Sequence, residues 1–172
     1  MFVELIATVF AGIACAGIAL LVNRLTGRRL PKWVMPVAAG AGMLAMTISN
    51  EYTWFSRTAD TLPDGMKVAM TVEDQSWLRP WTRIWPYTKR FVAVDTGTAR
   101  TNENLPGQKL VNLYFFGRWS PVNQTPMLFD CAVAQSALLI DGATFAQDGA
   151  ITDAEWQTMS ADDPVLAAVC AD

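Results

Sequence analysis

The chain has 172 residues, of which 52% are hydrophobic and 17% charged, and its formal net charge is −3. Soluble domains carry about 25% charged residues, so this chain has few charges for its length. Its high apolar content excludes a disordered chain, and its negative net charge excludes a basic, nucleic-acid-binding protein. The sequence contains no histidine. That absence excludes a Ser-His-Asp triad, a Cys-His dyad and every metal or haem site that depends on imidazole.

Two uncharged apolar runs lie near the N-terminus, at residues 5–22 and 33–50. As helices, each would be about 27 Å long, close to the ~30 Å hydrocarbon core of a bilayer. Residues 1–4 carry no positive charge, so we expect the first run to be a retained span and not a cleaved signal peptide. The sequence predicts a membrane α-helical hairpin of two transmembrane helices over residues 1–50. A single span and signal cleavage are the alternatives.

The connection between the runs, residues 23–32, is basic and contains no acidic residue. By the positive-inside rule, this loop is cytoplasmic. Both termini and the main domain then lie in the periplasm, on the outer face of a bacterial inner (cytoplasmic) membrane. The cations that determine this topology are Arg24, Arg28, Arg29 and Lys32.

Small residues recur at a spacing of four in both runs, where they allow helices to approach closely in lipid. We expect the two helices of the hairpin to pack on each other through these faces. Contact with other membrane subunits is the alternative. The residues are Gly12, Ala16, Ala38 and Gly42.

The rest of the chain divides into a connector at residues 51–65 and an exported α+β domain at residues 66–172. Met66–Val72 alternates between apolar and other residues, which is typical of a strand. The sequence predicts a mostly antiparallel sheet followed by two short C-terminal helices. Further strands are expected at 90–94, 110–116, 127–133 and 137–140, with a polar loop at 95–107 and turns at 141–142 and 148–149.

Capping residues mark where the two C-terminal helices should begin. Thr152 and Glu155 have the spacing of a capping box. Ser160, followed by the acidic pair at 162–163 and a proline, begins the second helix.

Two of the three cysteines, Cys131 and Cys170, lie in the exported part, where an oxidising compartment favours a disulfide. The bridge would close a loop of about 40 residues and stabilise the domain by roughly 2–4 kcal/mol. Two buried thiols are the alternative. The third cysteine, Cys15, lies inside the first apolar run.

Tryptophan and basic residues alternate in segment 76–91, SWLRPWTRIWPYTKRF. Two prolines limit any helix here to about one and a half turns or force an extended path. Trp with Arg suits a lipid interface or a protein interface, and burial of the three indoles in the core is the alternative. The candidate interface residues are Trp77, Arg79, Trp81, Arg83 and Trp85.

Charge is distributed unevenly along the exported part. Residues 76–118 contain seven basic and two acidic residues, whereas residues 120–172 contain eight acidic residues and no basic one. Electrostatic pairing across the fold is one interpretation. A domain with a basic side toward lipid or a partner is the other.

Motifs that carry catalysis are missing from the sequence: it has no phosphate-binding glycine loop, no G-x-S-x-G and no Cys-x-x-Cys. The predicted spans contain no internal charge that could relay protons or ions. We therefore expect a protein that is not an enzyme, with no cofactor, no metal and no nucleic-acid partner.

The segments VNRLTGRRLPKW and NEYTWF, with the later RPW and LFDC elements, resemble small inner-membrane proteins of purple and related α-proteobacteria. The hairpin also resembles in topology the U-shaped accessory subunits of purple-bacterial reaction centre–light-harvesting core complexes. The resemblance implies a non-catalytic accessory subunit that stabilises or shapes a photosynthetic core complex, with larger integral membrane subunits and lipid as partners. A respiratory-complex accessory subunit and a membrane-anchored periplasmic assembly factor or binding module are the alternatives.

Overall fold

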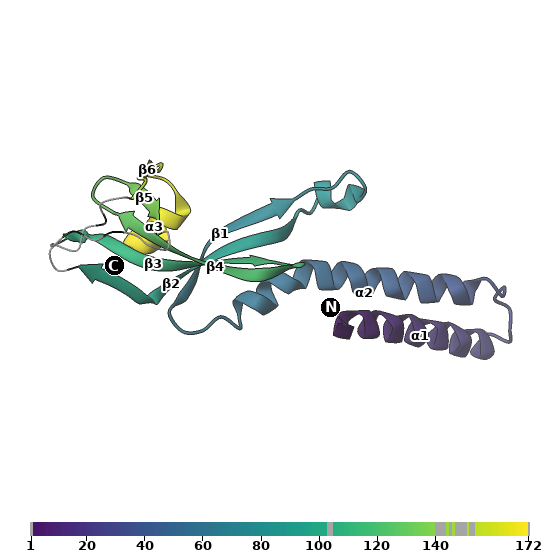
Figure 1. Ribbon diagram of the computed structural model, residues 1–172. Coiled ribbons are helices and arrows are strands. Elements are labelled where there is room, and N and C mark those ends of the chain that lie inside the picture. The colour runs from purple at the N-terminus through teal and green to yellow at the C-terminus, as the bar shows by residue number, and fades with distance from the viewer. Residues whose placement is uncertain are drawn as a thin grey trace. The chain divides into compact units, whose positions relative to one another are not determined.

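The computed structural model describes residues 2–102, 105–139, 144, 146, 151 and 154–171. The chain forms two compact units, Met1–Arg57 and Thr58–Asp172. We call them the helical unit and the sheet unit (Figure 1). The first consists of a pair of long helices, and the second of an antiparallel sheet with a C-terminal helix.

The helical unit contains α1 (Phe2–Leu25) and α2 (Val34–Ala59). Among the described helices, α1 alone is both long enough and apolar enough to cross a membrane. Helix α2 is longer, with 26 residues, but alanine, glycine and its polar C-terminal part lower its hydropathy. The predicted connector was wrong at its start, since residues 51–59 are helical. No proline or glycine interrupts the chain between Gly42 and Pro63.

The two helices approach each other closely at their glycines, which confirms the predicted packing within the hairpin. A Cβ atom built on the buried Gly12 would lie 2.6 Å from Met43 Cε, and one built on Gly42 would lie 2.5 Å from Cys15 Sγ. Ala16 and Ala38 are half-buried. Gly12 and Gly42 therefore lie at the contact between α1 and α2.

In the described part of the sheet unit, six antiparallel strands follow the order β1-β2-β3-β4-β5-β6, so each strand pairs with its neighbours in sequence. The sheet curls, and α3 (Pro164–Cys170) contacts β1 and β2. The strands are β1 (Met66–Asp74), β2 (Tyr87–Asn102), β3 (Leu105–Gly117), β4 (Ser120–Asp130), β5 (Gln135–Leu138) and β6 (Gln157–Thr158).

One face of this sheet forms the hydrophobic core with α3. The alternation along the strands puts every second residue on this face. It carries Val94 of β2, Leu113 of β3 and Phe129 of β4, and α3 contributes Leu166 and Val169. Phe129 and Val94 are completely buried.

The polar loop predicted at 95–107 was wrong, because β2 extends to Asn102 and β3 begins at Leu105. Arg100 pairs with Leu110, and Thr101 pairs with Lys109. Residues 103 and 104 lie outside the described residues. The polar side chains of this region lie on an extended hairpin, where exposed positions tolerate them.

The first of the two predicted C-terminal helices was also wrong where the structure describes it. Residues 154–156 are not helical, and Gln157–Thr158 forms β6 against Gln135 and Ser136 of β5. Met159 N donates to Ala134 O at 2.9 Å, which extends this pairing. Thr152 and the turns expected at 141–142 and 148–149 lie outside the described residues.

The other predicted strand ends also shift. The strand expected at 127–133 ends at Asp130, because residues 131–134 form a turn. The strand expected at 137–140 is β5, which ends at Leu138. Residue 140 lies outside the described residues.

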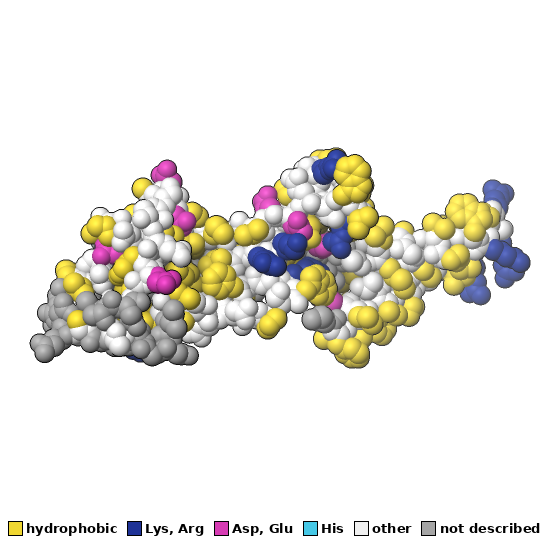
Figure 2. All heavy atoms as spheres, turned by 45° about the horizontal axis from the view of Figure 1, so that its top comes forward, with side chains coloured by type: hydrophobic (Ala, Val, Ile, Leu, Met, Phe, Trp, Pro, Cys, Tyr) yellow, Lys and Arg dark blue, Asp and Glu magenta, His cyan; other side chains and the backbone are white. Residues whose placement is uncertain are grey.

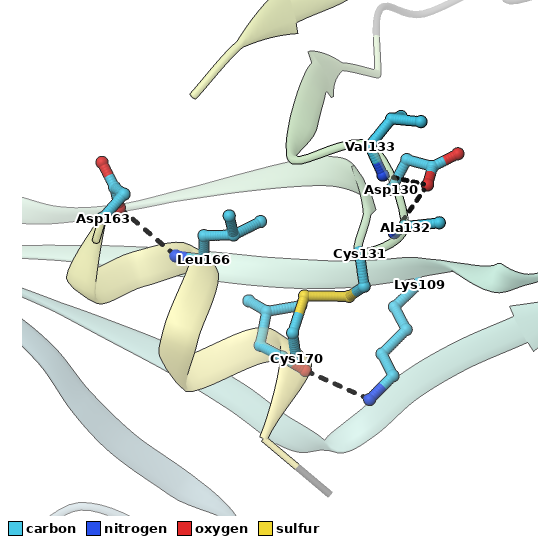
Figure 3. Close-up of a disulfide and its surroundings, with 9 residues drawn as sticks. Lys109, Asp130, Cys131, Ala132, Val133, Asp163, Leu166 and Cys170 are labelled. Atoms are coloured by element: carbon cyan, nitrogen blue, oxygen red, sulfur yellow. Dashed lines mark hydrogen bonds between the residues drawn. A yellow bond between two sulfur atoms is a disulfide. The ribbon is translucent and has the colours of Figure 1, made fainter. Parts of the chain in front are cut away.

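The predicted Cys131–Cys170 disulfide is confirmed, with Cα atoms 5.8 Å apart (Figure 3). It joins the β4–β5 turn to the end of α3. The second predicted helix is α3, but its predicted start at Ser160 was wrong, because residues 161–162 form a turn and the helix begins at Pro164. Asp163 caps it by accepting from Val165 N at 2.8 Å and Leu166 N at 3.3 Å. At the C-terminal end of α3, Lys109 Nζ donates to Val169 O at 3.3 Å. Cations favour this end of a helix.

Candidate functional site

The segment between β1 and β2 is a folded loop containing the 3₁₀ turn η1 (Pro80–Arg83). Pro80 begins this turn, as expected of a residue with fixed φ and no N–H. Thr82 is completely buried. Its Oγ1 accepts from Ser76 N at 2.9 Å and donates to Arg79 O at 2.7 Å. The loop is therefore held by polar bonds at its centre.

Around this centre, the loop exposes its large apolar side chains. Trp77 is 81% exposed and Trp85 is 65% exposed, so the core alternative is wrong for both. Trp81 is half-buried, and its Nε1 is enclosed with no acceptor among the described residues. The Arg83 guanidinium lies over the Trp77 ring, 4.6 Å from its centroid.

A second Trp–Arg pair, which the sequence analysis missed, lies in the β3–β4 turn. Trp119 is 60% exposed, and the Arg118 guanidinium lies 4.9 Å from its ring centroid. Arg90 of β2 pairs with Gly117 of β3. Arg118 N donates to Lys89 O at 3.4 Å. The β3–β4 turn and the β1–β2 loop therefore lie at the same end of the sheet.

We call this end of the sheet the aromatic–basic end (Figures 1 and 2). The β1–β2 and β3–β4 hairpins extend from the same side of the sheet unit in Figure 1. Figure 2 shows basic side chains beside hydrophobic ones on the β1–β2 hairpin. Its residues are the exposed Trp77, Leu78, Ile84, Trp85 and Trp119, the half-buried Trp81, and the cations Arg79, Arg83, Lys89, Arg90 and Arg118.

The acidic residues at this end leave it with a positive balance. Lys89 Nζ lies 2.8 Å from Asp74 Oδ2. The Lys89 hydrogen bond lowers the pKa of Asp74 below its ordinary value, and the Tyr87 hydroxyl adds a weaker bond. Glu73 is the other acid here. Five cations against two acids leave a formal charge of +3.

An apolar groove of about 460 Å³ adjoins the aromatic–basic end. Met70 and Val72 of β1 and Phe115 of β3 line it and are each more than a third exposed, and Arg90 lies on its wall. The groove therefore extends the apolar surface of the two hairpins along the strands.

A second groove, of about 380 Å³, is polar and lies between β2 and β3. Asp95 lines it, but its carboxylate already accepts from Gly97 N at 3.1 Å and Thr98 Oγ1 at 2.7 Å. Among the described residues, no group of three His, Cys, Asp or Glu side chains is placed to hold a metal ion.

The cations of the hairpin loop, Arg24, Arg28, Arg29 and Lys32, are all exposed. Figure 2 shows basic side chains, in dark blue, at one end of the helical unit. Arg28 has a positive φ of 60° and follows Gly27 with φ 73°, so the chain reverses within this short segment.

Comparison of the chain with protein-family models, with curated proteins and with solved structures finds no match.

Proposed function

We propose that this protein is a non-catalytic accessory subunit of an energy-transducing complex in a bacterial inner membrane. In this proposal, α1 and the apolar part of α2 cross the membrane as a hairpin. The sheet unit lies in the periplasm and docks at the outer face of the complex. Larger integral membrane subunits and lipid are its partners.

The observation that carries the proposal is the division of faces in the helical unit. Gly12 and Gly42 lie at the contact between α1 and α2, while large apolar side chains are exposed. Phe10 and Ile13 of α1 are 66% and 62% exposed, and Val37 and Leu44 of α2 are 56% and 55% exposed. Exposure on this scale is unfavourable in water, and lipid or other membrane helices would cover it.

Length supports a span in α2 despite its lower hydropathy. Its 26 residues measure about 39 Å along the axis, which exceeds the ~30 Å core of a bilayer. The uncharged stretch at 33–50 would span the core, and the polar residues from Glu51 onward would extend beyond it. The basic loop supports a cytoplasmic tip, and the disulfide supports an oxidising compartment for the sheet unit.

Alkaline phosphatase fused after Asp172 tests the two-span topology, because the enzyme is active only when exported. Two spans predict an active fusion, and fusion after Arg29 should be inactive. If α1 alone crossed the membrane with its basic flank inside, both fusions would be inactive. If α1 were a cleaved signal, the Asp172 fusion would be active, but the mass of the mature protein would lack the first run.

Co-purification in mild detergent tests the role. An accessory subunit should remain with a larger membrane complex in a fixed molar ratio. The resemblance found in the sequence makes photosynthetic core complexes the first to examine and respiratory complexes the second. A substoichiometric association confined to incomplete complexes would favour the assembly factor instead. A protein that purifies alone from intact membranes would contradict both.

A further inference from the structure

We propose that the aromatic–basic end of the sheet unit is a docking surface for anionic phospholipid headgroups of the membrane in which the hairpin is anchored. This inference rests on the proposed membrane anchoring and names the ligand of the exported unit. Trp119, Arg118, Leu78 and Ile84 join the predicted Trp and Arg interface residues of segment 76–91 in this surface.

Two projecting turns of this surface expose large apolar side chains. Trp77 and Leu78 are 81% and 87% exposed in one loop, and Trp119 is 60% exposed in the neighbouring turn. The β2–β3 register brings both turns to one end of the sheet. Monomeric proteins seldom group so much exposed apolar surface unless another phase or partner covers it.

Arginine cations pair with indole rings in both turns. Arg83 lies over Trp77 and Arg118 lies over Trp119. Each pair combines a ring that prefers headgroup depth with a guanidinium that binds phosphate in a bidentate manner. The same pairing occurs in two separate turns at one end of the sheet, where an anionic membrane surface can contact both.

The positive charge of this end complements an anionic membrane surface. The aromatic–basic end has a formal charge of +3, although the whole chain has −3. Lys89 already neutralises Asp74 at 2.8 Å. A basic end on an acidic protein directs that end, and not the remainder of the sheet unit, toward an anionic surface.

A short tether joins the sheet unit to the hairpin. Residues 60–65 separate α2 from β1, and six residues span about 20 Å at most. The anchor therefore keeps the sheet unit at high effective concentration beside the bilayer, where a weak surface contact is sufficient. The apolar groove lined by Met70, Val72 and Phe115 offers further surface to acyl chains near the headgroups.

The test uses the full chain reconstituted in phosphatidylcholine vesicles, with or without about 30 mol% phosphatidylglycerol. Part of the phosphatidylcholine carries bromine near the top of its acyl chains, which quenches nearby tryptophan fluorescence. Bromolipid should quench the wild type more strongly when phosphatidylglycerol is present. The triple variant Trp77→Phe, Trp85→Phe and Trp119→Phe should lose this additional quenching and retain that of the hairpin.

Charge variants separate electrostatic docking from simple proximity. Arg83→Gln with Arg118→Gln should weaken the phosphatidylglycerol-dependent docking about fivefold for each cation removed. Arg100→Gln, which removes an exposed cation of β2 outside this end, is the matched control and should leave docking unchanged.

Two results would overturn the inference. One is equal quenching of the wild type and the triple variant in both kinds of vesicle. The other is protection of these indoles only in native membranes and not in vesicles, which would assign the surface to a protein partner. Failure of the anchor is distinct, since alkaline carbonate would then release the protein from vesicles.

Discussion

The two ends of the sheet are built in opposite ways. At the disulfide end, the Cys131–Cys170 bridge, the Asp163 cap and the Lys109 bond to Val169 O hold α3 on the core. At the aromatic–basic end, Thr82 bonds organise a loop in which Trp77 and Trp85 are largely exposed. The same sheet thus carries a stabilising region and a contact region. Substitutions at the two ends should therefore affect different properties, stability at the first and association at the second.

The largest expected effect is at the core beside the disulfide. Phe129→Ala should lower the free energy of unfolding by about 3–5 kcal/mol, because Phe129 is completely buried between the sheet and α3. Urea unfolding of the full chain in detergent measures it. Phe115→Ala is the matched control and should cost less, since Phe115 is 40% exposed. Equal losses would remove the contrast between the two ends.

Removing the disulfide should have the next largest effect. Cys131→Ser with Cys170→Ser should cost about 2–4 kcal/mol, because the bridge restricts the unfolded chain across a sequence separation of 39 residues. Cys15→Ser removes the thiol that is not in the bridge and should leave urea unfolding of the sheet unit unchanged. A reductant should reproduce the double variant. A wild type unaffected by reductant would contradict the role given to this bridge.

Thr82→Val tests what organises the aromatic–basic end. The substitution keeps the shape but removes the hydroxyl that bonds Ser76 N and Arg79 O, and we expect a loss of about 1–3 kcal/mol. Hydrogen exchange of the β1–β2 loop should locate the effect there. Thr71→Val, at an exposed position of β1, is the control and should be near neutral.

Trp77→Ala with Trp85→Ala should change unfolding free energy by no more than about 1 kcal/mol, because both indoles are largely exposed. Binding of the sheet unit to vesicles that contain phosphatidylglycerol should fall in the same variant. A loss of several kcal/mol would show that these rings are packed in the folded protein, and the difference between the two ends would disappear.

The smallest expected effect is the pH dependence of the Asp74–Lys89 pair. Since the Lys89 bond lowers the pKa of Asp74, the pair stabilises the sheet unit at neutral pH. That stability is lost as pH falls through the lowered pKa and Asp74 is protonated. The urea midpoint of Asp74→Asn should differ slightly from that of the wild type near pH 7 and converge with it in strong acid. A difference that grows in acid would contradict the assignment.

Periodicity and composition predicted most of the strands, the helix capped by Asp163, and the disulfide. Met66–Val72 could be found because its alternation is local. The segment 95–107 could not, because its polar residues become strand only through pairs such as Arg100 with Leu110. The capping-box spacing at Thr152 and Glu155 was outweighed by pairing of Gln157 with Ser136. Tertiary pairing overrides local propensity at such places.

The candidate site was predicted in part for the same reason. The spacing of Trp77, Trp81 and Trp85 marked the β1–β2 loop, but only exposure separates Trp77 and Trp85 from the half-buried Trp81. Trp119 lies far along the chain and joins them through strand register. The continuation of α2 beyond residue 50 was predictable, because no helix-breaking residue occurs before Pro63.

The sequential strand order has a consequence for how the chain folds. Because each strand pairs with the one made just before it, the meander can form hairpin by hairpin as the polypeptide emerges, at little cost in loop closure. Contact of α3 with β1 joins the last helix to the first strand, so it must wait for the C-terminus. A chain interrupted shortly before Cys170 would hold paired strands around an uncovered core, and would be a substrate for chaperones and proteases.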